Sequence, residues 1–452
     1  MARYLIIGNG VTGTRAAELI RRKAPDDQVT LLTEEEYPFY RRPQLPDFAA
    51  GRVAGAGLWG KRSNFYDEHD ISLRLSSAVE EIDADKGEVI LAGGERLGYD
   101  GLLIATGRRP LPGDMPGSDL QGINCMKTLR EAKEIREWSA GAKTAAVAGD
   151  GMLALELVRA LTGAGFQTTY FVPGEKLWPE VLDEDTADIA AARVRASGAE
   201  LVFGGRVAAL EGDAQGRARA LVLEDGTRVE AGVIGVCTRY EPAVRFLPGG
   251  ADSLSGDGYA TIFEGVWAAG DVTVPTDTPY FNWLRSWRQG AAAGSAMLGL
   301  PATEKAELDL LNMQVLGLSL VAIGKTTVAY RSGYREMRGE YPYGEFYKKL
   351  VFDSSDVLVG ALLVGNIAEA GALEEAVRAG LTQDQLDPRL LHQMFDVTYR
   401  TEYLGVQCPV CRHEIQLSVG AAEGDRITCP ICGVDFTLKT ATGRGFVAKI
   451  AP

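Results

Sequence analysis

The chain lacks any apolar run long enough to cross a membrane, and it lacks an excess of basic residues. Its formal net charge is −14, from 47 Lys and Arg against 61 Asp and Glu. Because nucleic-acid binding needs clustered cations, this balance argues against a nucleic-acid partner. The N-terminal residues run directly into a strand pattern with no cleavable signal, so we expect a cytoplasmic protein without a membrane span.

Histidine and cysteine are also scarce, with three and six residues respectively. Cys125 and Cys237 stand alone in the sequence, and we expect both to be buried, inert thiols. The other four cysteines form two Cys-x-x-Cys pairs near the C-terminus. In a reducing compartment, such pairs indicate a metal site rather than disulfides.

At 452 residues the chain is too long for one hydrophobic core, because single cores rarely exceed about 250–300 residues. From Tyr4 to about Gly107, strand and helix patterns alternate, which predicts an α/β unit with a parallel sheet wound by helices. A second such unit ends near Pro242. A third region of short strands with one or two helices covers residues 308–392, and the tail from Cys408 is a small separate unit.

Two glycine-rich turns of the same design each follow an apolar strand and precede an amphipathic helix, at Gly8-Asn9-Gly10-Val11-Thr12-Gly13 and Gly149-Asp150-Gly151-Met152-Leu153-Ala154. In such a turn, the first glycine allows the bend, the second lets backbone N–H groups approach a pyrophosphate, and the third lets the helix pack on the strand. The two turns therefore predict two dinucleotide sites.

The first turn has further support from the strand Val29–Leu32, which ends in an acidic run. A carboxylate there can accept hydrogen bonds from ribose hydroxyls. Glu34 and Glu35 both qualify, and the run could equally be a solvated edge, so the sequence does not decide between the two residues.

These turns and three further motifs resemble the FAD/NAD(P)-dependent pyridine nucleotide-disulphide oxidoreductases, in the branch of rubredoxin reductase, ferredoxin reductases and the flavin segment of nitrite reductase. The resemblance covers residues 1 to about 300. It implies two Rossmann-like dinucleotide-binding domains, the second inserted in the first, and an α+β interface domain through which the chain forms a homodimer. The further motifs are Tyr40-Arg41-Arg42-Pro43-Gln44-Leu45, Ala105-Thr106-Gly107-Arg108-Arg109-Pro110 and Ala269-Gly270-Asp271.

The resemblance also implies which residues bind FAD. Asp271 is assigned to the ribityl-phosphate chain, although a turn or helix-cap residue is the alternative. Arg42 is assigned to the pyrophosphate as a bidentate cation, with a solvated cation beside Arg41 as the alternative. The remaining FAD-binding positions are Gly8, Gly10, Val11, Thr12, Gly13, Glu34 or Glu35, Val79 at the adenine, Ala105, Thr106 and Gly107.

A nicotinamide nucleotide is assigned to the second turn, at Gly149, Gly151, Met152 and Leu153. NAD-specific members place an acid at the end of the following strand, and NADP-specific members place an arginine nearby. This chain has Val172 at that position. We therefore expect the phosphate cradle to be kept and adenosine recognition to be weak, altered, or supplied by Glu175 or Lys176.

Glu156 matches a family glutamate beside the flavin and nicotinamide, and a partly exposed helix carboxylate is the alternative. The ferredoxin reductases pair that glutamate with a lysine, but this chain has Asp47 at the lysine position. The family's disulphide reductases carry a redox cysteine in the segment that matches residues 35–48, which contains none here. A flavin–disulphide relay is therefore not expected.

The C-terminal cysteines Cys408, Cys411, Cys429 and Cys432 form two knuckles separated by 17 residues. Four thiolates at this spacing can bind one tetrahedral metal ion. A structural zinc ribbon is favoured, because a domain this small needs a bound metal or a similar cross-link to be stable. A rubredoxin-like iron that relays electrons is the alternative.

Together these features predict an FAD-dependent oxidoreductase that passes electrons between NAD(P)H and a protein redox partner or redox subunit. Hydride transfer requires no general acid or base, which suits a chain with three histidines. The alternatives are an FAD-holding electron-transfer or assembly subunit with a degenerate NAD(P) site and a zinc ribbon for docking, and an NAD(P)H oxidase that reduces oxygen. The expected domains are 1–112 with 243–305 for FAD, 113–242 for NAD(P), 306–400 for the interface, and 401–452 for the ribbon.

Overall fold

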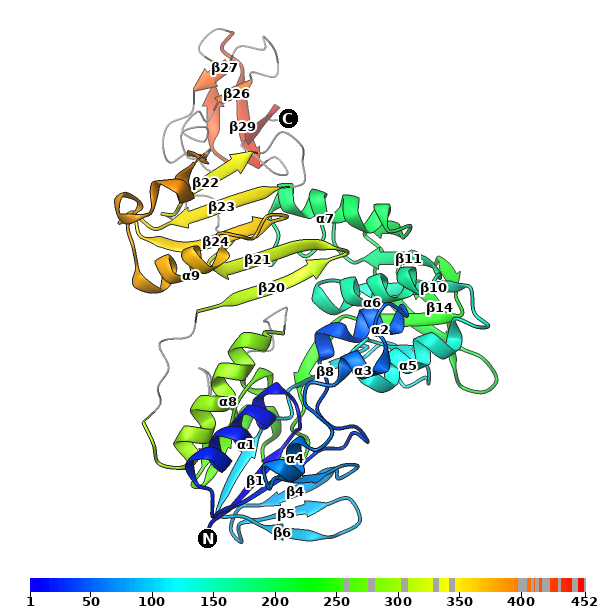
Figure 1. The fold of residues 1–452 in the computed structure, drawn as a ribbon. Helices are drawn as coiled ribbons and strands as arrows, with labels where there is room; N and C mark the ends of the chain where they lie inside the picture. The colour runs from blue at the N-terminus through cyan, green and yellow to red at the C-terminus, as the bar shows by residue number, and fades with distance from the viewer. Residues whose placement is uncertain are drawn as a thin grey trace. The chain divides into compact units, whose positions relative to one another are not determined.

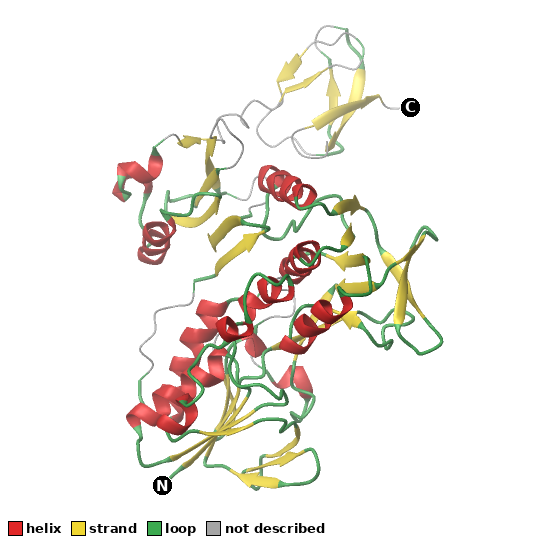
Figure 2. Cartoon of the chain, turned by 45° about the vertical axis from the view of Figure 1, so that its right-hand side comes forward, coloured by secondary structure: helices red, strands yellow, loops and turns green. Residues whose placement is uncertain are grey.

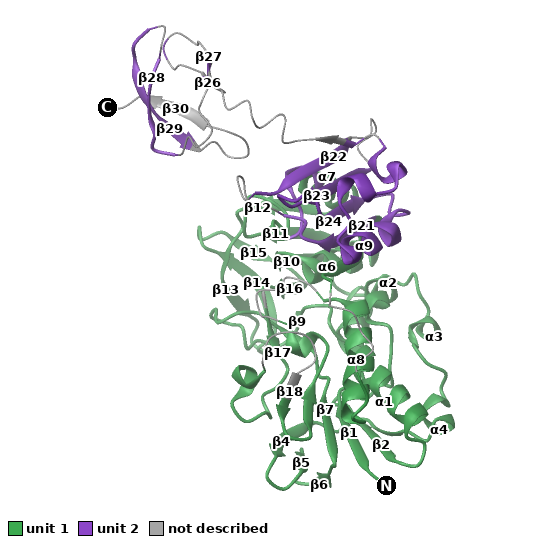
Figure 3. Ribbon diagram, turned by 90° about the vertical axis from the view of Figure 1, so that its left-hand side faces the viewer, with its two compact units in different colours: residues 1–180, 187–318 green, residues 181–186, 319–452 purple. Residues whose placement is uncertain are grey.

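The protein forms two compact units, which Figure 3 colours green and purple. Unit 1 comprises Met1–Glu180 and Ala187–Leu318, and unit 2 comprises Val181–Thr186 and Ser319–Pro452. The structure is a computed structural model, and it describes residues 1–254, 260–274, 281–301, 308–327, 333–340, 346–392, 394–396, 405–407, 410, 414–416, 423–429, 432–440 and 446–450.

Unit 1 begins with a six-stranded sheet of order β18-β19-β7-β1-β2-β3, in which every pair except β18–β19 is parallel. Along β1, Ile6 faces the helices α1 and α8, while Leu5 and Ile7 face a small antiparallel sheet, β4-β5-β6. Figures 1 and 2 show the two helices side by side on one face of the sheet. The bounds are β1 Arg3–Ile7, α1 Val11–Lys23, β2 Gln28–Leu32, β3 Ser72–Arg74, β4 Val79–Asp83, β5 Glu88–Leu91, β6 Arg96–Gly98, β7 Gly101–Ile104, β18 Ala260–Phe263, β19 Val266–Ala268 and α8 Trp283–Met297.

A second, fully parallel sheet of order β12-β11-β10-β16-β9 repeats this plan. A three-stranded sheet, β13-β14-β15, packs on one of its faces through apolar side chains. The bounds are β9 Ile123–Asn124, α5 Leu129–Trp138, β10 Thr144–Gly149, α6 Met152–Gly163, β11 Gln167–Val172, α7 Glu184–Ala196, β12 Glu200–Phe203, β13 Val207–Gly212, β14 Ala218–Leu223, β15 Arg228–Glu230 and β16 Val233–Cys237.

The chain crosses between the two sheets twice, on the antiparallel pair β8 (Arg108–Leu111) and β17 (Arg239–Pro242). In chain order, the second sheet is therefore an insertion between β7 and β18 of the first. Short elements complete unit 1, namely η1 Arg42–Gln44, α2 Leu45–Ala49, α3 Gly55–Leu58, α4 Phe65–Glu68, η2 Gly250–Ser253, η3 Asp271–Thr273 and β20 Leu310–Val315.

Unit 2 contains antiparallel strands in the order β21-β24-β23-β22-β25, followed by small strands near the C-terminus. Phe436 and Leu438 are fully buried in a small apolar cluster with Val406 and Cys429. The bounds are β21 Leu318–Gly324, β22 Arg335–Glu340, β23 Tyr347–Phe352, β24 Leu358–Val364, α9 Ala370–Ala379, η4 Gln383–Gln385, η5 Pro388–Leu391, β25 Met394–Asp396, β26 Gly405–Gln407, β27 Glu414–Gln416, β28 Arg426–Thr428, β29 Asp435–Thr440 and β30 Phe446–Ile450.

The predicted α/β class, with two parallel sheets and the second inserted in the first, is confirmed. The sequence did not predict that residues 181–186 belong to unit 2. The Asp183 carboxylate accounts for this, since it pairs with the Lys349 ammonium at 2.7 Å and accepts a hydrogen bond from the Tyr347 hydroxyl at 2.6 Å, both from β23. Lys349 is only 1% exposed, so its charge needs a buried partner.

Candidate functional site

The first glycine turn joins β1 to α1, and its three glycines have different surroundings. Gly8 has a φ of +112°, and a Cβ built there would lie 2.3 Å from the Ala105 oxygen. A Cβ on Gly13 would lie 1.9 Å from the Gly8 oxygen. A Cβ on Gly10 would meet no atom within 4 Å. Gly8 and Gly13 are thus required by packing, whereas Gly10 keeps space open at the N-terminus of α1.

The turn opens into a cavity of about 850 Å³, a size typical of cofactor pockets. Three of the predicted cofactor-binding residues do not line this cavity, namely Gly13, Gly149 and Gly151. Gly13 is buried in the first turn of α1. Both parallel sheets contribute to the lining, so the pocket lies where the two domains meet within unit 1. The lining includes the predicted residues Gly8, Gly10, Val11, Thr12, Glu34, Glu35, Arg42, Val79, Ala105, Thr106, Gly107, Asp271, Met152, Leu153 and Glu156.

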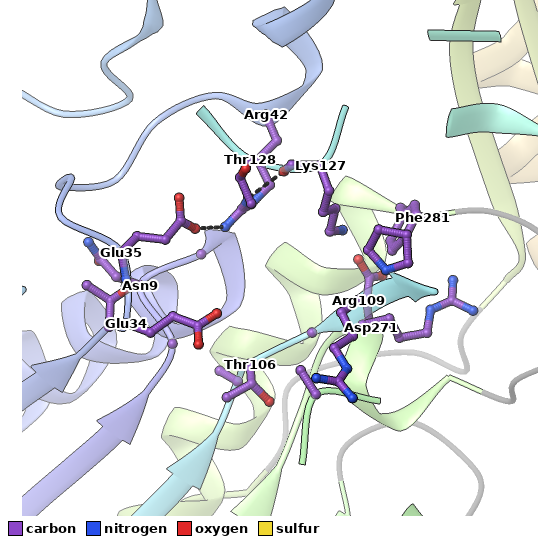
Figure 4. Close-up of a pocket in the computed structure, with 18 of the residues that line it drawn as sticks. Asn9, Glu34, Glu35, Arg42, Thr106, Arg109, Lys127, Thr128, Asp271 and Phe281 are labelled. Carbon is purple, nitrogen blue, oxygen red and sulfur yellow. Dashed lines mark hydrogen bonds and ion pairs between the residues drawn. The ribbon is translucent and has the colours of Figure 1, made fainter. Parts of the chain in front are cut away.

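Glu34 and Glu35 have different environments. The Glu35 carboxylate accepts hydrogen bonds from the Tyr40 hydroxyl at 2.7 Å and from the Arg42 guanidinium at 2.6 Å. Arg42 also donates to the Lys127 carbonyl oxygen at 2.7 Å. Glu34 is exposed and has no hydrogen-bond or ion-pair partner within the described part of the chain. Figure 4 shows Glu35 directed at Arg42 and Glu34 directed elsewhere in the pocket.

Asp271 follows β19 and begins the short helix η3. Its carboxylate accepts a hydrogen bond from the Ser286 hydroxyl at 3.1 Å. The preceding residue, Gly270, has a φ of +87°, and a Cβ there would lie 2.3 Å from the Thr12 hydroxyl oxygen. Glycine therefore lets the end of β19 approach the first turn of α1, which brings Asp271 into the same pocket as Gly10.

Two polar atoms in this pocket are buried and lack a partner among the described residues, the Asn9 side-chain nitrogen and the Thr106 hydroxyl. Buried donors and acceptors are nearly always hydrogen-bonded in folded proteins. Together with the open space at Gly10, these two atoms fit a polar ligand such as the pyrophosphate and ribityl parts of FAD. Figure 4 shows Asn9 and Thr106 on the same side of the pocket as Glu34.

The other end of the pocket contains Glu156 and Lys127. Glu156 lies on α6 and is 9% exposed. Burial raises the pKa of Glu156 to about 7, partly offset by Arg159 and Lys127. Burial lowers the pKa of Lys127 to about 7, against the nearby Asp271 carboxylate. The Lys127 ammonium lies 3.4 Å from the centre of the Phe281 ring, a cation–π contact.

Asp47, at the position where the ferredoxin reductases have lysine, carries the same charge as Glu156 and raises the pKa of Glu156 instead of pairing with it. Its carboxylate pairs with Arg52 at 2.8 Å and with Arg159 on α6. These pairs tie α2 to the helix that carries Glu156. Lys127 is instead the lysine that lines the pocket with Glu156.

The second glycine turn joins β10 to α6, and Gly149 packs against the Cys237 carbonyl of β16. The Asp150 carboxylate folds back on the turn and accepts hydrogen bonds from the N–H of Gly151 at 2.7 Å and of Trp178 at 2.9 Å. Val172, at the end of β11, is fully buried. Its side chain is also apolar, so it offers no hydrogen-bond acceptor to a ribose.

Comparison with known proteins decides the family. The model for pyridine nucleotide-disulphide oxidoreductases matches residues 2–294, well over half of the chain. The chain belongs to this family. Within the described residues of this oxidoreductase, no helix is both long and apolar enough to span a bilayer.

Several curated members of the family are similar over most of their length. The chain is 28% identical to the NADH-dependent phenylglyoxylate dehydrogenase subunit epsilon of Aromatoleum evansii, covering 83% of this chain and 91% of that protein. It is 26% identical to the rubredoxin-NAD(+) reductase of Pseudomonas putida, covering 72% and 90%.

Solved structures of the family share the fold. A NAD-dependent persulfide reductase from A. fulgidus has a TM-score of 0.73 and 25% identity, covering 85% of this chain and 78% of that one. The covalent putidaredoxin reductase–putidaredoxin complex gives a TM-score of 0.74 at 19% identity, covering 86% and 95%. The second likeness supports the fold alone.

The cysteines of this oxidoreductase fall into two groups. Cys125 and Cys237 are buried, as expected, but they are not isolated in space, because they lie on or next to the neighbouring strands β9 and β16. The hydrogen bond to Cys237 and burial raise the pKa of Cys125 well above its usual value, which disfavours the reactive thiolate.

At the C-terminus, Cys429 is buried and Cys432 is exposed, while Cys408 and Cys411 lie outside the described residues. No group of three or more metal-ligating His, Cys, Asp or Glu side chains occurs in the part of the chain that the structure describes. The four-cysteine metal site therefore stays a prediction.

Sequence reasoning missed Lys127, Asn9 and Phe281 as lining residues. No local pattern marks a single lysine after a short strand or a phenylalanine before a helix. Asn9 was within the glycine turn, and its variable position in that motif gave no reason to select it.

Proposed function

We propose that this chain is an FAD-dependent oxidoreductase that passes electrons between a nicotinamide nucleotide and a protein redox partner. One observation carries the proposal. A single pocket brings together the first glycine turn, Glu34, Asp271 and, from the second sheet, Glu156 and Lys127. The rubredoxin and ferredoxin reductases among its relatives support a protein partner, and the NADH-dependent subunit supports NADH as the donor.

The residues of the pocket divide by chemistry. The N–H groups around Gly10, the Asn9 amide and Arg42 would hold the pyrophosphate, while Glu34 would accept the ribose hydrogen bonds and Asp271 those of the ribityl chain. The other predicted FAD-binding residues would line the rest of the cofactor. FAD, when bound, supplies the electron-carrying chemistry. Glu156 and Lys127 lie at the end of the pocket nearest the second sheet, and each has a pKa of about 7, so both can gain or lose a proton near neutral pH.

Anaerobic titration of the purified, FAD-loaded protein with NADH and NADPH tests the proposal. We expect one of them to bleach the flavin absorbance at a rate that saturates with nucleotide. If dithionite alone bleaches it, the chain is instead an FAD-holding electron-transfer or assembly subunit. The buried Val172 and the Asp150 carboxylate favour that second function.

Glu34 and Glu35 are expected to differ on substitution. Glu34→Gln should weaken FAD binding by about tenfold or more, because a hydrogen bond to a charged group contributes about 1.5–3 kcal/mol. It should leave the melting temperature of the FAD-free protein unchanged. Glu35→Gln should lower that melting temperature, because Arg42 and Tyr40 lose their carboxylate. FAD titration and thermal unfolding measure both effects. Equal melting temperatures for the two variants would contradict the assignment.

Flavin reduction by NADH should depend on pH with a midpoint near 7, because Glu156 and Lys127 both titrate there. Glu156→Gln removes a carboxylate that raises the pKa of Lys127, so the remaining midpoint should move below that of the wild type. Anaerobic stopped-flow measurement across the pH range gives the profile. Glu137→Gln, which changes an exposed carboxylate on α5, is the control. An unchanged midpoint in Glu156→Gln would show that neither group reports on the reaction.

We also propose that Cys408, Cys411, Cys429 and Cys432 bind zinc. The support is their spacing and the buried position of Cys429 in a small apolar cluster. Metal analysis of the purified protein should find about one zinc per chain, and an iron-thiolate visible spectrum would favour the rubredoxin-like alternative.

The four-domain division given by the sequence is likewise proposed, with the insertion of the second sheet as its support.

A further inference from the structure

The two glycine turns differ at the residue between their first two glycines, which is Asn9 in the first turn and Asp150 in the second. The Asn9 side-chain oxygen does not bond to the backbone of its own turn. It accepts hydrogen bonds from the Tyr66 hydroxyl at 2.9 Å and from the Thr14 hydroxyl at 3.2 Å. Its side-chain nitrogen, a buried donor, has no partner among the described residues. The first turn therefore presents an unused donor.

The second turn presents the opposite chemistry. The Asp150 carboxylate accepts a hydrogen bond from the N–H of Gly151, the second glycine of its own turn. That glycine is the position at which the backbone approaches a pyrophosphate in this motif. The carboxylate thus occupies a donor that a bound nucleotide would use, and it places a negative charge where the phosphates would bring two more.

A second contact fixes the carboxylate in this orientation. The same Asp150 oxygen accepts a hydrogen bond from the N–H of Trp178 at 2.9 Å. Trp178 is fully buried and has a φ of +48°, a left-handed conformation that is unusual for a bulky side chain. Because packing holds Trp178 in place, the carboxylate cannot turn away from Gly151 without leaving a buried N–H without a partner.

We propose that Asp150 competes with the pyrophosphate of the nicotinamide nucleotide and thereby lowers the affinity of the second site at neutral and alkaline pH. Protonation of the carboxyl removes its charge, so nucleotide affinity rises as the pH falls. This inference rests on the proposed function, since it concerns the nucleotide site of the same oxidoreductase.

The surroundings of Asp150 agree with a change in its protonation state near physiological pH. Burial raises the pKa of Asp150 to about 6, partly offset by the hydrogen bonds from Gly151 and Trp178. Glu180 raises it further, and Asp150 also interacts with the buried Tyr170 of β11. The first turn of α6 carries no acidic residue. Because the pKa is raised, the neutral form predominates only below about pH 6.

ADP-ribose is the appropriate probe, because it carries the adenosine and pyrophosphate of the nucleotide but no hydride donor. We expect Asp150→Asn in the FAD-loaded full-length protein to bind ADP-ribose at least tenfold more tightly than the wild type at pH 7.5. Asparagine keeps an oxygen for both N–H groups, so the turn should be preserved. At pH 5.5 the difference should shrink to less than threefold, because the wild-type affinity rises. Glu180→Gln, a nearby charge outside the turn, should change the dissociation constant by less than twofold.

Equal dissociation constants for wild type and Asp150→Asn at pH 7.5, or no binding by either in the millimolar range, would overturn the inference. If the variant does not fold, the pH dependence of wild-type binding decides, and a flat profile between pH 5.5 and 7.5 is the contrary result. Failure of the proposed function gives a different result, because neither nucleotide would then bleach the flavin whatever ADP-ribose does.

Discussion

A Gly10→Val variant is expected to fold normally but to purify without FAD. Gly10 has extended backbone angles that any residue can adopt, with φ −85° and ψ −170°. A Cβ there meets no protein atom within 4 Å, so the valine side chain would extend into the open space that we assign to the pyrophosphate. We expect the flavin content to fall below about a tenth of the wild-type value, because close backbone approach is the reason for glycine at this position.

The control for this variant is Gly8→Ala. Its Cβ would lie 2.3 Å from the Ala105 oxygen, on a residue with a φ of +112°. Gly8→Ala should therefore lower the yield of folded protein and its melting temperature, as well as the flavin content. The ratio of flavin to protein absorbance and a circular-dichroism melt measure the two variants. Retention of full flavin content by Gly10→Val would refute the assignment of the first turn to FAD.

Replacement of Lys349 by Met is expected to destabilise unit 2 by on the order of 3–5 kcal/mol, the usual cost of removing one member of a buried ion pair. Lys349 is 1% exposed and lies 2.7 Å from Asp183 and 3.6 Å from Glu336. Without the ammonium, two carboxylates remain close together with little solvent. Hydrogen exchange of the β23 amides should then be faster by about a hundredfold or more, since each 1.4 kcal/mol corresponds to about tenfold.

The neighbouring lysine provides a matched control. Lys348 is also buried, but its partner Glu369, at 2.6 Å, is 36% exposed and can be solvated when the lysine is removed. Lys348→Met should therefore cost less than Lys349→Met. If the two variants are equally destabilised, side-chain packing rather than charge explains the effect.

Acidification should act on the same ion pair. Burial alone would raise the pKa of Asp183, but the Lys349 ammonium and hydrogen bonds from Lys349, Thr186 and Tyr347 lower it to about 2. A carboxyl with a lowered pKa stabilises the fold above its unfolded pKa of about 4, and this contribution is lost as the pH falls toward 2. The difference in the hydrogen-exchange rate of the β23 amides between wild type and Lys349→Met should accordingly become smaller below about pH 4.

The fold could be predicted from the sequence wherever a periodic pattern coincided with a glycine turn. The strand, glycine turn and helix that begin at Tyr4 and at Ala145 are of this kind, since the chemistry of the turn and the apolar period both specify the same structure. The association of residues 181–186 with unit 2 could not be predicted in this way. It depends on a pair between Asp183 and Lys349, which are more than 160 residues apart.

Most of the residues that line the pocket could be named from the sequence, but the contacts between them could not. Glu34 and Glu35 are indistinguishable in the sequence, and the positions of Tyr40 and Arg42 separate them, because both donate hydrogen bonds to Glu35. The position of Lys127 depends on the insertion of the second sheet, because this lysine follows β9 by three residues and lies near Asp271. The sequence shows that residue 47 is aspartate where the ferredoxin reductases have lysine. It does not show that Lys127 lines the pocket with Glu156.

The antiparallel pairing of β8 with β17 places Leu111 directly opposite Arg239, so the polypeptide leaves and re-enters the first sheet at almost the same point. A short linker between these two strands would in principle close the first domain on itself, as is common for inserted domains. Such an excised protein would keep the Gly8 turn, Glu34 and Asp271 but lose Lys127, Met152, Leu153 and Glu156. The part of the pocket that we assign to the adenosine end of FAD would be kept, whereas the part lined by Lys127 and by the residues of α6 would be missing.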